Sequence, residues 1–166
     1  MHNQLTEQDI KKMEEEIEHR KLVVRKQALE AVKEARAHGD LSENFEYHAA
    51  KKEKNRNESR IRYLERMIRT AKVVSDNSAE DEVGINNIVT VYFEEDDEED
   101  TFKLVTTVRG DTLHGLISVE SPIGKAIMGH KVGETVEVRV NDTYSYPITI
   151  RSIQNTTDEN DTIRRY

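Results

Sequence analysis

The chain has 166 residues, 35% hydrophobic and 35% charged, with a mean hydropathy of −0.81. This length suits one ordinary domain or two small ones, and the composition argues against one large core. The absence of cysteine excludes thiol catalysis, disulfides and the usual structural zinc sites, and the absence of a long apolar stretch or basic-then-apolar leader predicts a cytoplasmic protein with no membrane partner.

The net charge of −8 is distributed unevenly along the chain. Residues 1–75 carry 17 Lys+Arg against 14 Asp+Glu, a balance of +3, which leaves 8 against 19, or −11, for residues 76–166. The acidic part would be repelled by bare nucleic acid, whereas the mildly basic part tolerates it. We therefore expect a boundary near residue 75 and no binding to free DNA.

Residues 1–75 are predicted to form a helical hairpin. Thr6 followed by Asp9 is a helix-start signal, and Gly39 permits a tight reversal between two arms. Apolar positions recur at steps of three and four in both arms, which predicts an antiparallel coiled coil. The seam positions are Ile10, Met13, Ile17, Val24, Ala28, Ala31 and Ala35, then Tyr47, Ala50, Lys54, Asn57, Ile61, Leu64, Ile68 and Ala71. Because Lys54 and Asn57 are polar, we expect a firm base and a softer distal end.

An acidic pair lies at the turn between the two arms. In the segment HGDLSENFEYHAA, Asp40 and Glu43 lie at this turn. A long hairpin can carry two carboxylates into a place that the globular part of the protein cannot enter. The same two residues also fit a capping box, with Asp40 as N-cap of the second helix and Glu43 at its third position. Ser42 is an alternative cap, and the sequence leaves the choice open.

The remaining residues are predicted to form a second domain. Residues 76–84 indicate a polar linker, residues 85–154 a small antiparallel sheet with one short helix, and residues 155–166 a disordered tail. The helix is marked by Ser121 as N-cap, Pro122 at its first position and Gly129 at its end. The predicted strands are Ile88–Phe93, Phe102–Val108, Leu113–Glu120, Thr135–Val140 and Tyr146–Arg151. The fold class is therefore α+β.

Three segments of the chain resemble the bacterial transcript cleavage factors of the Gre family, GreA type. They are HGDLSENFEYHAA on the hairpin, RIRYLERMIRTAKVV after it, and ISVESPIGKAIMGHKVGETVEV in the second domain, and the resemblance runs from Thr6 to Ile153. It implies an N-terminal coiled coil that enters the secondary channel of RNA polymerase and an FKBP-like C-terminal domain that docks at the channel rim. The segment LVTTVRGDTLHG, in the docking domain, departs from the family pattern.

The resemblance implies a transcription elongation factor that restarts arrested polymerase. The factor stimulates the polymerase's own Mg²⁺-dependent cleavage of the extruded RNA 3′ end and is not an autonomous enzyme. Mg²⁺ prefers oxygen ligands in near-octahedral geometry, so Asp40 and Glu43 alone make an incomplete site and complete one only with polymerase carboxylates. The expected partners are RNA polymerase and nascent RNA, and the free protein is expected to be a monomer in the bacterial cytoplasm.

Residues beside the acidic pair are candidates for supporting roles. Phe45 either stacks near an extruded base or fills the narrow end of the hairpin, Tyr47 is expected on the seam, and Glu46 is expected to assist at the tip. Basic side chains on the two arms are candidates for contacting RNA phosphates, although each also fits an ordinary solvated helix face. These are Arg36, Lys51 and Lys52.

Other classes of protein remain as alternatives. A channel-binding polymerase inhibitor or divergent paralogue would share the architecture. A prolyl isomerase would need several convergent aromatic side chains, but the chain has no Trp and, among phenylalanines, only Phe93 and Phe102 outside the hairpin. A coiled-coil adaptor or chaperone would favour an apolar tip over an acidic one.

Overall fold

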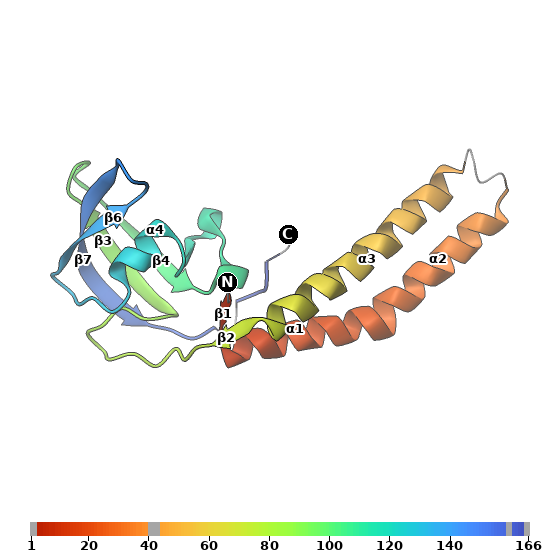
Figure 1. The fold of residues 1–166 in the computed structure, drawn as a ribbon, viewed down its shortest axis with the longest axis horizontal. Coiled ribbons are helices and arrows are strands. Elements are labelled where there is room, and N and C mark those ends of the chain that lie inside the picture. Colours follow the sequence, from red (N-terminus) through yellow and green to blue (C-terminus); the bar gives the residue numbers. More distant parts are fainter. Residues whose placement is uncertain (1–2, 40–43, 159–160, 165–166) are drawn as a thin grey trace. The chain divides into compact units, whose positions relative to one another are not determined.

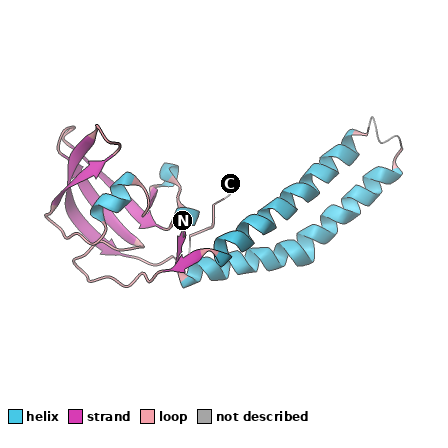
Figure 2. Ribbon diagram, viewed as in Figure 1, coloured by secondary structure: helices cyan, strands magenta, loops and turns pink. Residues whose placement is uncertain are grey.

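The computed structural model describes residues 3–39, 44–158 and 161–164. The chain divides into two compact units, Ile10–Ala71 and a second unit of Met1–Asp9 with Lys72–Tyr166. The first is a helical hairpin and the second contains a mixed β-sheet, as the ribbons in Figures 1 and 2 show. The predicted α+β fold with an N-terminal hairpin is therefore confirmed.

The first arm of the hairpin is not one regular α-helix. It consists of α1 (Glu7–His19), a π-helical turn (Arg20–Val24) and α2 (Arg25–Ala37). The second arm is α3 (Phe45–Arg69). The sequence predicts neither the π-helical turn nor two short strands, β1 (Asn3–Leu5) and β2 (Ala71–Val73), which pair with each other.

The predicted start of the first helix is confirmed by its hydrogen bonds. The hydroxyl of Thr6 accepts from the backbone N–H of Asp9 at 3.1 Å, and the Thr6 backbone N–H donates to Asp9 Oδ2 at 3.0 Å. These reciprocal bonds satisfy two donors that a helix start leaves without intrahelical partners.

Burial along α3 is uneven. Among its described residues the buried ones begin only at Asn57, and they are Asn57, Arg60, Ile61, Leu64 and Met67. The seam positions nearer the tip, Tyr47, Ala50 and Lys54, are only partly buried. This gradient fits the expected difference between base and distal end, although two of the buried residues are polar.

The sheet of the second unit has five strands in the order β5-β4-β3-β7-β6. Its strands are β3 (Asn87–Phe93), β4 (Glu98–Val105), β5 (Leu116–Ser118), β6 (Thr135–Arg139) and β7 (Ser145–Asn155). β3 pairs antiparallel with both β4 and β7, with a register shift against β7 at Thr90/Val91, and β6 pairs antiparallel with β7. The short helix α4 (Pro122–Ile127) is capped by Ser121, whose side chain accepts from Gly124 N, so the predicted helix start is confirmed.

The prediction of a wholly antiparallel sheet is wrong at one edge. β5 runs parallel to β4, with Leu104 opposite Ile117. Parallel neighbours need a connection that returns the chain to the same end of the sheet. Here two 3₁₀ turns, Thr107–Arg109 and Thr112–His114, make that return, so β4 ends earlier and β5 is shorter than the sequence predicts.

The hydrophobic core of this unit lies among the strands, α4 and the end of the predicted linker. Val83 is 2% exposed, its N–H donates to His130 O at 2.9 Å, and its carbonyl accepts from Gly129 N at 3.0 Å. Residues 76–84 therefore lack a helix or strand but end packed in the core. The core members are Val83, Ile85, Val89, Val91, Phe102, Leu104, Val119, Ile127, Val138, Ile148 and Ile150.

The predicted disordered tail is wrong for the residues that the structure describes beyond β7. Asp158 is buried, and Asp161 accepts hydrogen bonds from Lys103 and Arg109 at 2.8 Å each. The Arg164 N–H donates to Val108 O at 2.7 Å. The polar composition of this segment predicts disorder, but its Asp161 carboxylate pairs with two cations of the domain, Lys103 and Arg109.

The close approach of α4 to the chain before it gives the first prediction. A Cβ at Gly124 would lie 2.2 Å from Ser118 O and 2.9 Å from Val119 backbone atoms. Gly124→Ala should therefore force the helix outward and lower the free energy of unfolding by about 1–3 kcal/mol, measured by denaturant unfolding. Lys125→Ala, at the next and exposed position, is the control. Equal stability of the two variants would contradict the close packing.

Candidate functional site

The acidic pair Asp40 and Glu43 lies in residues 40–43, which are outside the described part of the chain. The residues on either side of it, Gly39 and Asn44, are described. Gly39 has φ +132°, a backbone conformation that L side chains rarely adopt. Asn44 has an extended conformation, φ −86° and ψ 92°, as expected of an N-cap residue. Gly39 therefore follows the first arm, Asn44 begins the second, and four residues connect them.

Asn44 is the N-cap of α3, so the prediction of a capping box from Asp40 to Glu43 is wrong, as is the alternative of Ser42. Its Oδ1 accepts from Tyr47 N at 3.0 Å, and its Nδ2 donates to Ala35 O at 2.6 Å. One amide side chain thus starts the second helix and bonds the last turn of the first. This frees the acidic pair from a capping role in α3.

Two aromatic side chains beside the turn differ in their surroundings. Phe45 is 86% exposed, which contradicts the alternative in which it fills the narrow end of the hairpin. Tyr47 is partly buried on the seam, and its hydroxyl accepts from Arg36 Nη2 at 3.3 Å. The Arg36 guanidinium also lies 5.5 Å from the Tyr47 ring centroid, and its hydrogen bond lowers the pKa of Tyr47.

The other predicted site residues are exposed. Glu46 has an exposed side chain whose Oε2 lies 3.6 Å from His38 Nδ1. Lys51 and Lys52 are exposed on α3, and Arg36 is exposed on α2 while it stacks on Tyr47. Among the described residues next to the turn, the hairpin therefore presents one large apolar side chain, Phe45, and cationic side chains from both arms.

A polar network between the arms accounts for the π-helical turn. The Arg20 carbonyl accepts from Arg25 N five residues on and from Asn57 Nδ2 at 3.3 Å, while Arg20 Nη1 donates to Asn57 Oδ1 at 3.0 Å. A side chain that bonds a helical carbonyl from outside favours a widened turn. The sequence shows Asn57 only as a polar seam position, because its partner lies 37 residues away.

Glu16 joins both arms at the base of this network. Its carboxylate accepts from Arg20 Nε at 2.7 Å and from Arg60 Nε and Nη2 at 2.8 and 3.2 Å. Burial alone would raise the pKa of Glu16, but the hydrogen bonds from Arg60 and Arg20 outweigh it and lower this pKa. A second, bidentate pair joins Arg25 to Glu58 at 2.7 and 2.9 Å.

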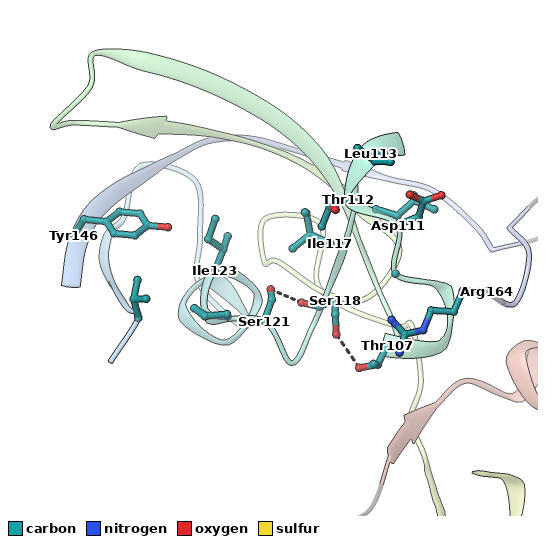
Figure 3. A pocket seen from close by; sticks show the side chains of 14 residues that line it. Thr107, Asp111, Thr112, Leu113, Ile117, Ser118, Ser121, Ile123, Tyr146 and Arg164 are labelled. Carbon is teal, nitrogen blue, oxygen red and sulfur yellow. Dashed lines mark hydrogen bonds between the residues drawn. The ribbon is translucent and has the colours of Figure 1, made fainter. Parts of the chain in front are cut away.

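The sheet unit contains a pocket of about 510 Å³ between α4, β5 and the turns after β4. Figure 3 shows Tyr146 at one end and Thr107 with Arg164 at the other. Ser121 Oγ donates to Ser118 O at 2.6 Å, and Ser118 Oγ lies 2.8 Å from Thr107 Oγ1. Tyr146 is the one aromatic side chain among the described lining residues, so the pocket lacks the convergent aromatics expected of a prolyl isomerase.

In the described part of the chain no three or more His, Asp or Glu side chains are grouped so as to hold a metal ion. None of the described helices is long and apolar enough to cross a membrane.

Comparison with known families assigns both units. The model "Transcription elongation factor, N-terminal" matches residues 3–73, and the model "Transcription elongation factor, GreA/GreB, C-term" matches residues 77–155.

Two relatives named GreA agree with these matches. The transcription elongation factor GreA of Caldanaerobacter subterraneus subsp. tengcongensis is 47% identical over 137 residues, covering 82% of this chain and 87% of the relative. GreA of Streptococcus pneumoniae is 41% identical over 153 residues, covering 92% and 95%. The crystal structure of GreA factor homolog 1 of Thermus thermophilus aligns with 93% of this chain and 100% of its own, at 24% identity and a TM-score of 0.43.

Asn44 offers a test of how the turn is held. Asn44→Ala should lower the free energy of unfolding by about 1–2 kcal/mol, because it removes the cap of α3 and the bond to Ala35 O. Asn44→Asp keeps the cap and loses only the amide donor, so its loss should be smaller. Thermal unfolding followed by circular dichroism distinguishes them. Two equally stable variants would show that the cap contributes nothing, and an Asn44→Asp variant as stable as the unsubstituted protein would show the same of the bond between the arms.

The lowered pKa of Glu16 predicts a pH dependence of stability. Its folded-state pKa lies below the unfolded value of about 4.3, so its contribution is complete above that value and is lost as the pH falls through the folded pKa. Glu16→Gln should therefore destabilise the hairpin at pH 7 by about 1–2 kcal/mol and by much less near pH 3. Glu14→Gln, at an exposed position of α1, is the control. A pH-independent difference would contradict this assignment.

Proposed function

Because the chain belongs to the GreA/GreB family of transcription elongation factors, we propose that it binds RNA polymerase and inserts its hairpin into the secondary channel. There it stimulates cleavage of the extruded RNA 3′ end in backtracked complexes and restarts arrested elongation. The protein supplies no complete active site and acts through the polymerase. It acts as a monomer in the bacterial cytoplasm.

The observation that carries this proposal is the way the turn is held between Gly39 and Asn44. Asn44 caps α3 and bonds the first arm, so the four residues between these two positions start and end at fixed backbone. Asp40 and Glu43 are then not needed to cap α3, and their carboxylates are available for another role. A short tether on both sides restricts where these oxygens can lie, as orienting a catalytic group requires.

We infer that Asp40 and Glu43 complete a Mg²⁺ site together with polymerase carboxylates. Carboxylate oxygens are the ligands that Mg²⁺ prefers, and two of them leave positions for water and phosphate. A Mg²⁺ ion bound there would activate the attacking water and stabilise the leaving oxygen. The chain's own part is to deliver both carboxylates to the polymerase active centre and to hold them there.

The neighbouring side chains have supporting roles in this proposal. The exposed ring of Phe45 stacks on an unpaired base of the extruded RNA, since aromatic rings bind bases of any sequence. Lys51 and Lys52 contact its phosphates. Arg36, stacked on Tyr47, mainly orients that ring and the end of the first arm.

Two alternatives are less favoured. A coiled-coil chaperone would hold its clients with an apolar tip, whereas Phe45 is the one large exposed apolar side chain described beside the turn. A prolyl isomerase is disfavoured by the single aromatic residue, Tyr146, among the described lining residues of the sheet-unit pocket.

Neutral replacements of the acidic pair test the function. Asp40→Asn/Glu43→Gln should reduce stimulated cleavage in a backtracked complex by at least about 100-fold, because two metal-binding oxygens are lost while the size of both side chains is kept. The measurement is the rate at which 3′-end RNA fragments are released at fixed Mg²⁺ concentration. Binding to the polymerase should be unchanged.

Glu53→Gln is the matched control, because Glu53 is an exposed carboxylate on α3 that pairs only locally with Arg56. This variant should retain full cleavage. If the double variant cleaved as well as this control, the assignment of the acidic pair would be wrong. If the unsubstituted chain bound polymerase and blocked synthesis without cleavage, the protein would be a channel inhibitor.

A further inference from the structure

The sheet unit encloses a charged side chain that the proposed function does not use. Arg109, in the 3₁₀ turn after β4, is 1% exposed. Its Nε donates to Asp9 Oδ1 at 2.6 Å, and its Nη1 donates to Asn86 Oδ1 at 2.7 Å and to Asp161 Oδ2 at 2.8 Å. A buried guanidinium is tolerated only where such partners replace water.

A second cation reaches the same place from β4. Lys103 Nζ donates to Asp161 Oδ2 at 2.8 Å and to Thr157 O at 2.6 Å, and its side chain is 15% exposed. Asp158 lies beside Arg109, with its Oδ2 3.8 Å from Nη2, and the same oxygen accepts from Thr6 Oγ1 at 3.0 Å. Two carboxylates, three residues apart on one segment, therefore meet two cations that both belong to the sheet domain.

The segment that supplies these carboxylates follows the last strand. None of residues 156–158 and 161–164 belongs to the hydrophobic core of the domain, so polar contacts hold the segment in place. It also lies beyond residue 155, where the match to the C-terminal family model ends. A segment without buried apolar anchors opens at a low free-energy cost compared with the core.

Part of the hydrogen bonding of Arg109 comes from outside this segment. Asp9 and Asn86, neither of which belongs to the segment, accept from Arg109 Nε and Nη1. The Nη2 atom of Arg109 has no hydrogen-bond partner among the described residues, so Asp158 at 3.8 Å does not use this donor fully. The site therefore has one buried donor available to a further carboxylate oxygen.

We propose that Lys103 and Arg109 form a binding site for acidic peptides, which the C-terminal segment fills from within the same chain. The ligand is a peptide with two carboxylates three residues apart, the spacing of Asp158 and Asp161. The segment acts as a tethered ligand, and an external peptide of the same chemistry displaces it. This site lies in the sheet unit and uses none of the residues at the hairpin turn.

A mobility measurement on the full chain tests the proposal. The chain has no cysteine, so Thr162→Cys at an exposed position of the segment accepts one fluorescent probe, whose anisotropy reports whether the segment is bound. The competitor is a synthetic acetylated peptide of residues 155–161, and the control peptide carries Asn at both Asp positions. Concentrations up to about 10 mM are needed, because a short tether gives an effective concentration on the order of millimolar.

The expected result is high anisotropy in the unsubstituted background and low anisotropy in Asp158→Asn/Asp161→Asn. Lys103→Gln, which leaves the buried Arg109 intact, should also lower it. Asp142→Asn, at an exposed carboxylate that pairs with Arg139, is the control and should change nothing. The acidic peptide should mobilise the probe, and the Asn peptide should not.

Two results would overturn the proposal. Unchanged anisotropy in both the double variant and Lys103→Gln would show that the carboxylates do not hold the segment. A probe that is freed by these substitutions but unaffected by the acidic peptide would make the segment a fixed structural element and not an exchangeable ligand. Cleavage activity is not the readout, so failure here and failure of the proposed function are distinguishable.

Discussion

The buried guanidinium of Arg109 constrains more of the sheet unit than any single apolar contact. It needs acceptors from all sides, and these come from Asp9 near the N-terminus, Asn86 before β3 and Asp161 after β7. Asp9 also accepts from Thr6 N and Thr106 Oγ1, so the first turn of α1 is bonded to the turn after β4. Removing Asp9, the fully buried partner of Arg109, is costly, which fixes the first turn of α1 to the turn after β4.

The hairpin depends on a comparable polar constraint rather than on a continuous apolar seam. Asn57 bonds both the side chain and the carbonyl of Arg20, and Glu16 bonds Arg20 and Arg60. Directional bonds specify which residues lie opposite each other more strictly than apolar contacts do. The register of the two arms, and hence the residues that meet at the turn, follows from this network.

Local signals in the sequence predicted the parts of the fold that depend on neighbouring residues. The bonds between Thr6 and Asp9 and the cap of α4 by Ser121 are such cases, since the partners lie three residues apart. The cap of α3 was mistaken because Asp40, Ser42 and Asn44 are all good capping residues, and the bond from Asn44 to Ala35 O decides between them only in the folded hairpin.

Other features are not predicted by the sequence because they depend on residues far away along the chain. The π-helical turn at Arg20 depends on Asn57, and the order of the C-terminal segment depends on Lys103 and Arg109. The parallel edge strand β5 depends on two 3₁₀ turns that no period-two pattern encodes. For the candidate site, the sequence named the acidic pair and its neighbours, whereas the exposure of Phe45 and the stacking of Arg36 on Tyr47 required the structure.

The central claim is that the turn of the hairpin reaches the RNA 3′ end inside the polymerase. Site-specific photo-crosslinking tests it most directly, with a benzophenone side chain in place of the exposed Phe45 and RNA labelled at its 3′ end. The account predicts a crosslink to the extruded 3′ segment in backtracked complexes and none to RNA in complexes that have not backtracked. Crosslinks confined to the outer surface of the polymerase, with no labelled RNA, would contradict it.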